Sequence, residues 1–480
     1  MTPLVVGEGS APLGTAWLSN GTGVDLAAAG YREDEYLVAG TAGVWGRDRD
    51  GAAVLTHSAP YVTRVLVRRP IEEARFTGVV EAEPLHQEYD AAMSWRAAHR
   101  WIIRTGAAWM GVTQDPRLAA SMRDEFDPVR YAPLSIPKAG MGFDIVGDVA
   151  RAARAGLVPA LSGGCRPRRI HLSGWSATGS FCRAFLGDGF HDRHRREDGA
   201  PPFDGYLIGI SSGGAVAGGY PQLSEGAARP PVGDSRRTIA GYDVPVVELL
   251  SELESETQGP CLRPDADALD DRYRLYQVAG TSHDSFGPRR ALTNQTQYRE
   301  RGFEVPARRT NEPLSDAPGQ VVAHAAYALL DRWARDGAEW APPRAPRFEL
   351  TDEPPDHANP TGEARALRRD AFGNAVGGIR TPWIEAPLAT YVPSSTPAPG
   401  MRPSRWAPPG ADPTHIAALT GSARPFSERV VRELYASRED YVRRYAAACD
   451  RLVEEGLLLT EDAAELVADA RERPLPLPLR

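Results

Sequence analysis

Lysine is almost absent from this chain of 480 residues, in which Lys138 is the only one and arginine supplies the rest of the basic charge. We interpret this bias as the codon usage of a GC-rich genome. The formal net charge is -8 at pH 7, and apart from residues 193–196 the chain has no Lys/Arg-rich run. This charge balance argues against a nucleic-acid partner.

Long apolar runs are absent as well. No stretch approaches the ~20 residues that a membrane-spanning helix needs, and Met1 to Leu18 lacks the basic and apolar regions of a signal peptide. We therefore expect a cytoplasmic protein without a membrane partner. The sequence leaves the oligomeric state open and allows a homo-oligomer.

Cysteine is scarce, and the four cysteines show none of the spacings typical of metal sites. We expect Cys165, Cys182, Cys261 and Cys449 to be free thiols. The run His191-Asp192-Arg193-His194 is better explained as a solvated polar loop than as a metal site. The glycine pairs at 213–214 and 218–219 do not follow a strand in the pattern G-x-G-x-x-G. The sequence therefore predicts no metal and no cofactor.

Short apolar runs alternate with amphipathic stretches along most of the chain. The runs predict strands at 61–69, 76–81, 107–113, 170–172, 206–210, 244–250 and 273–278, and the amphipathic stretches predict helices at 94–105, 143–155, 180–186 and 321–335. Residues 1–60 are expected to form edge strands and loops. The alternation predicts an α/β fold with a mostly parallel central sheet and helices on both faces.

We expect one domain over residues 1–480, with a catalytic core at about 60–340. Residues 211–241 are rich in Gly and Pro and long for a structureless connection, which is typical of a lid or an insertion. Residues 341–480 form a Pro-rich and then helical C-terminal extension. Its aromatic and aliphatic content predicts that it packs on the core rather than acting as a linker.

The segment from Arg169 to Leu186 has the layout of a nucleophile elbow: a strand, a tight turn that holds Ser176, and a helix. Small residues are needed around such a serine, and Gly174 and Ala177 meet that need. Thr178 departs from the common G-x-S-x-G form, with Gly179 one place later. The alternative is a serine in an ordinary strand-to-helix loop.

An acid and a histidine follow later strands in the order Ser, acid, His that α/β-hydrolases use. Glu252 and Glu254 follow the strand at 244–250, and His283 follows the strand at 273–278. The two glutamates flank Leu253, so in an extended segment both would point the same way. Glu254 is favoured because the acid usually sits a few residues past the strand end, and Glu252 is the alternative.

An oxyanion hole needs two N–H donors. The N–H of Ala177 is the first candidate. The second is expected in the loop at 82–86, where Pro84 cannot donate and Leu85 or His86 would supply the N–H. His86 as an ordinary turn residue is an equally good interpretation.

Several segments resemble one known family. They read TRVLVRRP at 63–70, GAAWMGVT at 106–113, FDPVRYAPL at 126–134, FDIVGDVARA at 143–152, PFDGYLIG at 202–209, VAGTSHDS at 278–285 and GGIRTPWIEAPLATY at 377–391. Together they resemble the bacterial alpha/beta hydrolase domain-containing proteins, a family of serine esterases. The resemblance runs from about Thr63 to the last helix and implies an α/β-hydrolase fold that includes the C-terminal segment.

Carried over residue by residue, the resemblance implies Ser176 as nucleophile, His283 as base and Glu254 or Glu252 as acid. Two places depart from the family. The usual Gln-Ser-Gly after the nucleophile is replaced by residues 177–179, and the usual Asn-containing turn after the second strand is replaced by residues 83–86.

These observations predict a serine hydrolase that cleaves a small-molecule carboxylic ester or lactone through an acyl-enzyme. An acyltransferase would use the same acyl-enzyme with an alcohol or amine acceptor. A non-catalytic binding protein on a hydrolase scaffold is a further alternative, motivated by the two departures. The sequence does not identify the acyl group, the alcohol or the pathway.

Overall fold

The computed structural model describes residues 2–3, 10–211, 220, 223, 228–231, 233–257, 262–285, 292–356, 364–407 and 411–475. Of the predicted lid at 211–241, residues 211, 220, 223, 228–231 and 233–241 are described and the others lie outside the described residues, as does Cys261. None of the helices in the described ranges combines the length and apolarity that a membrane span requires.

A ten-stranded sheet runs through the molecule in the order β1-β2-β3-β5-β4-β6-β7-β8-β10-β9. Its strands are β1 (Thr2–Pro3), β2 (Tyr31–Arg47), β3 (Ala53–Pro70), β4 (Val79–Pro84), β5 (Ala108–Val112), β6 (Arg169–Trp175), β7 (Gly205–Gly209), β8 (Val246–Leu250), β9 (Ala266–Ala268) and β10 (Asp271–Gln277). The strands from β5 through β4, β6, β7 and β8 to β10 are parallel, whereas β1, β2, β3 and β9 pair antiparallel. The carboxyl ends of the six parallel strands therefore share one edge of the sheet.

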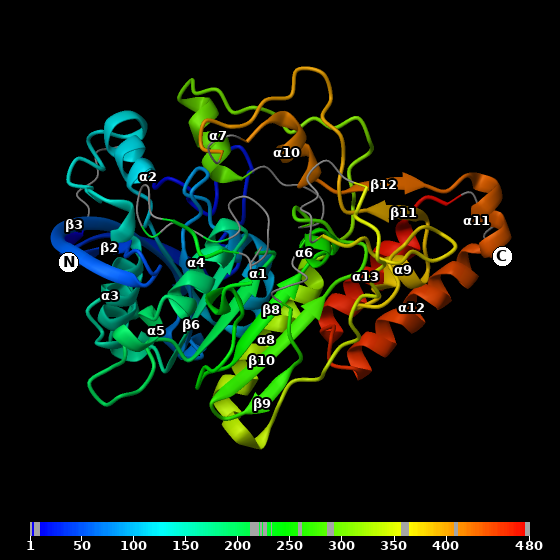
Figure 1. Ribbon diagram of the computed structural model, residues 1–480. Coiled ribbons are helices and arrows are strands. Elements are labelled where there is room, and N and C mark those ends of the chain that lie inside the picture. The colour runs from blue at the N-terminus through cyan, green and yellow to red at the C-terminus, as the bar shows by residue number, and fades with distance from the viewer. Residues whose placement is uncertain are drawn as a thin grey trace.

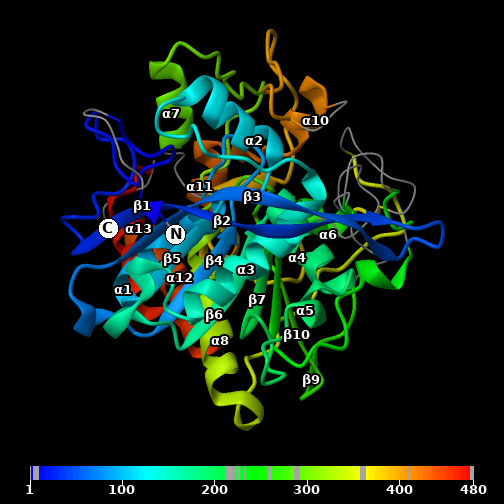
Figure 2. The same cartoon turned by 90° about the vertical axis from the view of Figure 1, so that its left-hand side faces the viewer.

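Helices cover both faces of the sheet (Figures 1 and 2). The longer ones are α1 (Met93–Thr105), α3 (Gly142–Arg154), α4 (Ala177–Gly187), α8 (Gln320–Asp336), α12 (Arg438–Glu454) and α13 (Thr460–Glu472); the shorter ones are α2 (Pro116–Ser121), α5 (Phe190–Arg193), α6 (Glu252–Thr257), α7 (Thr293–Glu300), α9 (Pro382–Glu385), α10 (Pro413–Ala418) and α11 (Glu428–Leu434). A second sheet pairs β11 (Ala389–Val392) with β12 (Ser422–Pro425). Apolar side chains of α3 and α4 pack on one face of the main sheet, and those of α1 and α8 pack on the other.

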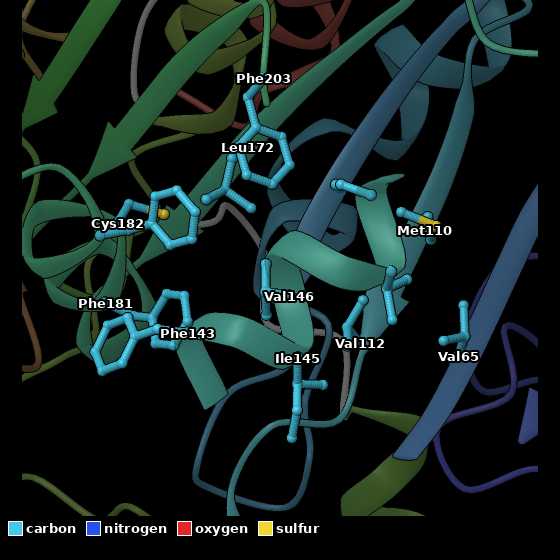
Figure 3. Packing of buried hydrophobic residues seen from close by; sticks show 14 of the residues in the cluster. Val65, Met110, Val112, Phe143, Ile145, Val146, Leu172, Phe181, Cys182 and Phe203 are labelled. Atoms are coloured by element: carbon cyan, nitrogen blue, oxygen red, sulfur yellow. The ribbon is translucent and has the colours of Figure 1, made fainter. Parts of the chain in front are cut away.

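The core between the sheet and α3 and α4 is dense and aromatic. Phe143 of α3 and Phe181 of α4 stack with their ring centroids 4.4 Å apart, and both lie near Leu172 of β6 and the buried Cys182 (Figure 3). The parallel strands are buried along almost their whole length, as expected for strands covered on both faces. This packing holds the carboxyl ends of β6, β8 and β10 in fixed positions.

The C-terminal extension packs on the core, as its composition predicts. Asp462 of α13 accepts two hydrogen bonds from Arg104 of α1, at 2.8 and 3.0 Å, and pairs with Nδ1 of His324 on α8 at 2.8 Å. A buried carboxylate that is hydrogen-bonded on both oxygens ties three helices together. Helices α12 and α13 thus form an outer layer over α1 and α8 (Figure 1).

Two features differ from the sequence-based expectation. The edge hairpin is long, because β2 and β3 pair over seventeen and eighteen residues where short strands were expected. His191 and His194 are buried rather than solvated. His191 bonds Tyr206 Oη at 2.8 Å and Asp243 at 3.0 Å, and His194 bonds Asp144 at 3.0 Å. Their polar neighbours are thus structural partners supplied by distant segments, which sequence spacing does not reveal.

Candidate active site

Ser176 occupies a strained turn between β6 and α4. Its φ of 59° and ψ of -123° lie in a region that residues other than glycine rarely adopt. The strand and the helix approach so closely that positions 174 and 179 have no room for a side chain. A Cβ on Gly174 would lie 2.1 Å from the carbonyl oxygen of Thr178, and a Cβ on Gly179 would lie 2.7 Å from Cβ of Ser211. The turn therefore presents the serine hydroxyl at the carboxyl edge of the sheet.

Thr178, the departure from the common motif, braces this turn. Its hydroxyl donates to the carbonyl oxygen of Trp175 at 2.9 Å and accepts from the N–H of Trp175 at 3.0 Å. The threonine hydroxyl thus stabilises the turn by bonding both the N–H and the carbonyl oxygen of Trp175. In the sequence Thr178 is visible only as a departure from the motif, because its role depends on this local hydrogen bonding.

His283 lies directly beside Ser176. Its Nε2 is 2.7 Å from Oγ of Ser176, and its side chain is 16% exposed. The loop that carries it follows β10 and is held by backbone bonds, including that from the N–H of Ala279 to the carbonyl oxygen of Ile379 at 3.1 Å. The imidazole is therefore within hydrogen-bond reach of the hydroxyl, as a general base must be.

Glu254 lies on the other side of the imidazole. Its Oε1 is 2.7 Å from Nδ1 of His283, and the hydroxyl of Ser251 donates to Oε2. Burial alone would raise the pKa of Glu254, but the neighbouring His283 and the hydrogen bonds from His283 and Ser251 outweigh it and lower the pKa. The carboxylate is thus ionised where it can fix the proton of His283 on Nδ1.

Glu252, the alternative acid, points elsewhere. Its Oε1 accepts from the N–H of Gly280 at 2.6 Å, and its Oε2 pairs with Arg369. The expectation that Glu252 and Glu254 point the same way was wrong, because they lie in a helix, α6, and not in an extended segment. Two residues along a helix are about 200° apart around its axis, so the two carboxylates diverge.

Arg369 anchors the helix that carries Glu254. Besides Glu252, it contacts Oε1 of Glu256 at 3.4 Å, and the N–H of Leu367 donates to the same oxygen at 3.1 Å. Burial raises the pKa of Glu252, and the charge of Arg369 opposes that shift. The C-terminal extension thus fixes the position of α6 through Arg369. Because Glu252 of α6 also bonds Gly280, the same contacts help to position the loop that carries His283.

We expect Arg369→Gln to lower kcat by about 10- to 100-fold with little change in KM, because a misplacement of about 1 Å at the reacting groups costs this much. Steady-state kinetics on an ester substrate would measure both constants. Arg369→Lys should recover most of the loss, since it restores the charge beside Glu252. The control is Arg368→Gln, because Arg368 is 65% exposed and pairs only with Glu349 in the described residues. Equal losses in Arg368→Gln and Arg369→Gln would contradict the anchoring role.

The loop after β4 does not offer the backbone donor that the sequence predicts at Leu85 or His86. The N–H of Leu85 donates to the carbonyl oxygen of Val112 at 2.8 Å, and that of His86 to the carbonyl oxygen of Ala91 at 2.9 Å. An N–H that is already bonded is not free for a substrate oxygen, so neither fits the role in this arrangement. The N–H of Ala177 lies at the first position of α4, where a helix leaves its N–H groups without intrahelical acceptors.

Glu83 of β4 fixes the start of α1 next to this loop. Its buried carboxylate accepts from the N–H groups of Ser94 and Trp95, at 2.7 and 3.2 Å, and from Nε1 of Trp109 at 2.8 Å. Burial raises the pKa of Glu83 to about 7, against the lowering effect of these hydrogen bonds. The native protein therefore holds this proton more tightly than the unfolded chain does.

This raised pKa predicts a pH-dependent stability. Between the ordinary pKa of 4.5 and the folded value of about 7, the unfolded chain releases the proton while the native state keeps it. The stability that Glu83 contributes is thus greatest below pH 4.5 and falls as the pH rises through 7. We expect the wild type to lose up to about 3 kcal/mol relative to Glu83→Gln between pH 5 and pH 8. Urea unfolding of both proteins at the two pH values would measure this, and parallel changes would contradict it.

A cavity opens beside His283 at the carboxyl edge of the sheet. Apolar side chains from the ends of three strands, Trp175, Leu249 and Val278, make much of its wall, and Ser251 and Gln320 add polar groups. A wall of this kind lowers the local dielectric and strengthens the hydrogen bonds of the neighbouring groups.

Two segments that are distant in sequence cover this edge. The chain around α7 and the chain around α10 lie above it (Figure 1), and the N–H of Gly421 donates to Oγ of Ser282 at 3.0 Å. Arg308 follows α7 and bridges Asp284, at 3.1 Å, and Glu88, at 3.3 Å. The covering segments thus contact both the His283 loop and the loop after β4.

The alpha/beta hydrolase domain family matches residues 1–468 of this chain. The chain belongs to the alpha/beta hydrolase family. The predicted fold class is therefore confirmed, and the matched region of this α/β-hydrolase includes α12 and most of α13. No curated protein matches the sequence.

Solved structures of other hydrolases are similar to this α/β-hydrolase at low identity. Esterase Est22 is 15% identical with a TM-score of 0.29, covering 47% of this chain and 65% of its own. A thermostable esterase from Pseudomonas putida ECU1011 is 11% identical with a TM-score of 0.27, covering 48% and 66%. An alpha/beta hydrolase enzyme from the metagenome of Lake Arreo, Spain, is 12% identical with a TM-score of 0.28, covering 52% and 75%. This chain thus spans less than two thirds of the length of Est22, and the likeness concerns the fold alone.

Proposed function

We propose that this α/β-hydrolase is a serine esterase that cleaves a small carboxylic ester or lactone. The observation that carries the proposal is the continuous hydrogen-bonded chain from Ser176 through His283 to Glu254, with both contacts at 2.7 Å. A hydroxyl, an imidazole and an ionised carboxylate in this order make a serine nucleophilic at neutral pH.

In the proposed reaction, Oγ of Ser176 attacks the ester carbonyl carbon while its proton moves to Nε2 of His283. The carbonyl electron pair moves onto oxygen, and the N–H of Ala177 donates to that oxyanion. When the tetrahedral intermediate collapses, the C–O bond to the alcohol breaks and the leaving oxygen takes the proton from His283. Water then repeats the sequence on the acyl-enzyme and releases the acid, which regenerates Ser176.

Glu254 stabilises the imidazolium and keeps the proton of the neutral imidazole on Nδ1. Its lowered pKa means that it carries its charge throughout the neutral range. The buried carboxylate does not need to accept a proton at any step.

Labelling with a fluorophosphonate probe tests the proposal, because the probe phosphonylates only an activated serine. We expect a single label, located on Ser176 by peptide mass spectrometry, together with turnover of p-nitrophenyl esters in buffer without an added acceptor. A folded protein that neither takes the label nor hydrolyses any ester of a chain-length series would overturn the proposal. Labelling with turnover only after an alcohol or amine is added would instead indicate an acyltransferase.

A further inference from the structure

The loop after β4 carries an imidazole whose hydrogen bonding determines its tautomer. Nδ1 of His86 accepts from the N–H of Glu88 at 3.0 Å, so Nδ1 bears no proton. In a neutral imidazole the proton is then on Nε2, which makes Nε2 a donor. Within the described residues, this Nε2–H has no hydrogen-bond partner, although His86 is only 9% exposed.

Strand register places this loop beside the serine. Ala82 of β4 pairs with Leu172 of β6 in a parallel ladder. His86 lies four residues after Ala82, and Ser176 lies four residues after Leu172. The ladder between β4 and β6 ends at the pair of Ala82 and Leu172, where neighbouring strands are about 4.8 Å apart. His86 and Ser176 therefore follow the end of the ladder by the same number of residues on adjacent strands.

Arg308 ties the same loop to the base. It contacts Glu88, two residues after His86, and Asp284, one residue after His283. The guanidinium therefore holds the loop of His86 against the loop of His283 from the covering segment. The two imidazoles and the serine hydroxyl thus lie on three elements at one edge of the sheet.

His86 is also neutral. Burial lowers its pKa to about 4, and the nearby His283 and Arg308 act in the same direction against the charge of Glu88. A neutral imidazole keeps its Nε2–H as a donor without releasing a proton, which suits a group that stabilises developing negative charge.

We propose that the Nε2–H of His86, a side chain and not a backbone amide, is the second donor to the substrate oxyanion. This inference rests on the proposed esterase function. As Oγ of Ser176 attacks, the carbonyl electron pair moves onto oxygen, and that oxygen accepts hydrogen bonds from the N–H of Ala177 and from Nε2–H of His86. No proton is transferred from His86, so its tautomer is unchanged at the end of each cycle.

A pair of variants separates this role from the structural bond to Glu88. In His86→Asn, the side-chain oxygen can still accept from the N–H of Glu88, but no group reaches the position of Nε2. In His86→Gln, the amide nitrogen reaches that position and donates, but the bond to Glu88 is lost. We expect kcat to fall by about 10²- to 10³-fold in His86→Asn, as for the loss of one oxyanion donor, and to recover to within about tenfold of the wild type in His86→Gln.

The decisive measurements are kcat and KM, taken separately, and inhibition by an analogue of the oxyanion intermediate. The probes are the p-nitrophenyl ester that the wild type hydrolyses fastest and a trifluoromethyl ketone with the same acyl chain, which forms an oxyanion adduct on Ser176. In His86→Asn, KM should stay near the wild-type value while inhibition by the ketone weakens in proportion to kcat. Substitution of the exposed His57 by Asn is the control and should change neither.

The outcomes are distinguishable. Full activity and unchanged ketone inhibition in His86→Asn would overturn this inference alone and would point to a backbone donor such as the N–H of Gln87. Activity in His86→Asn with loss in His86→Gln would show that His86 only shapes the turn. Absence of labelling and turnover in the wild type would overturn the esterase function, and this inference with it.

Discussion

Replacing Ser176 by alanine is expected to lower kcat for ester hydrolysis by about 10⁴- to 10⁶-fold, the range that nucleophile removal produces in serine hydrolases. The loss is large because no other group can form the acyl-enzyme, and His283 alone can only assist a direct attack by water. What remains should come from the oxyanion donors and from substrate binding. The measurement is steady-state turnover of a p-nitrophenyl ester, together with fluorophosphonate labelling.

The fold should survive this change. Alanine keeps the Cβ of Ser176, so the backbone at φ 59° is no more strained than before, and the hydroxyl makes its hydrogen bond to His283 at a partly exposed site. We expect the thermal midpoint to stay within a few degrees of the wild type. Alanine at Ser58, an exposed residue of β3, is the control and should retain full activity. Turnover of Ser176→Ala above about one per cent of the wild type would rule out Ser176 as the nucleophile.

Glu254→Gln is expected to lower kcat by about 10³- to 10⁴-fold, because an amide in place of the orienting carboxylate reverses the tautomer of the histidine. The amide nitrogen of the new side chain would donate to Nδ1 of His283, which forces the proton onto Nε2. That nitrogen could then no longer accept the proton of Ser176. KM should change little, since Glu254 does not face the substrate in this arrangement.

Glu252→Gln is the matched comparison, because both residues are buried glutamates of α6. We expect kcat of Glu252→Gln to fall by no more than about 100-fold, as for Arg369→Gln. The change would shift α6 slightly but would keep the hydrogen bond between Glu254 and His283. Its stability should fall, because Arg369 loses a buried partner. A larger kinetic loss in Glu252→Gln than in Glu254→Gln would assign the orienting role to Glu252.

Much of the architecture could be predicted because the relevant signals are local. Apolar runs without alternation indicated the buried strands, and β5, β6, β7, β8 and β10 lie where those runs occur. Helix periodicity placed α1, α3 and α8 within two residues of their observed ends. The strand-turn-helix pattern around Ser176 was visible because strand and helix can approach so closely only over small residues such as Gly174.

The end of β4, the bonding of the loop that follows it and the helical conformation of α6 could not be predicted in the same way. β4 extends to Pro84, three residues beyond the expected end, and the N–H groups of Leu85 and His86 find carbonyl partners in Val112 and Ala91. Backbone partners of this kind depend on which strand and turn lie alongside. The role of Thr178, which departs from the common motif, likewise depends on its two hydrogen bonds to the backbone of Trp175.

The sequence by itself determined the order of the elements and the position of Ser176, Glu254 and His283 just after three buried strands. These features follow from hydrophobic periodicity and turn chemistry, which act over a few residues. Only the tertiary structure decided which glutamate reaches His283, that Arg369 holds α6 from 117 residues away through Glu252, and that Arg308 joins two loops at the sheet edge. Such contacts join segments that meet only after the sheet has assembled, so no local pattern in the chain encodes them.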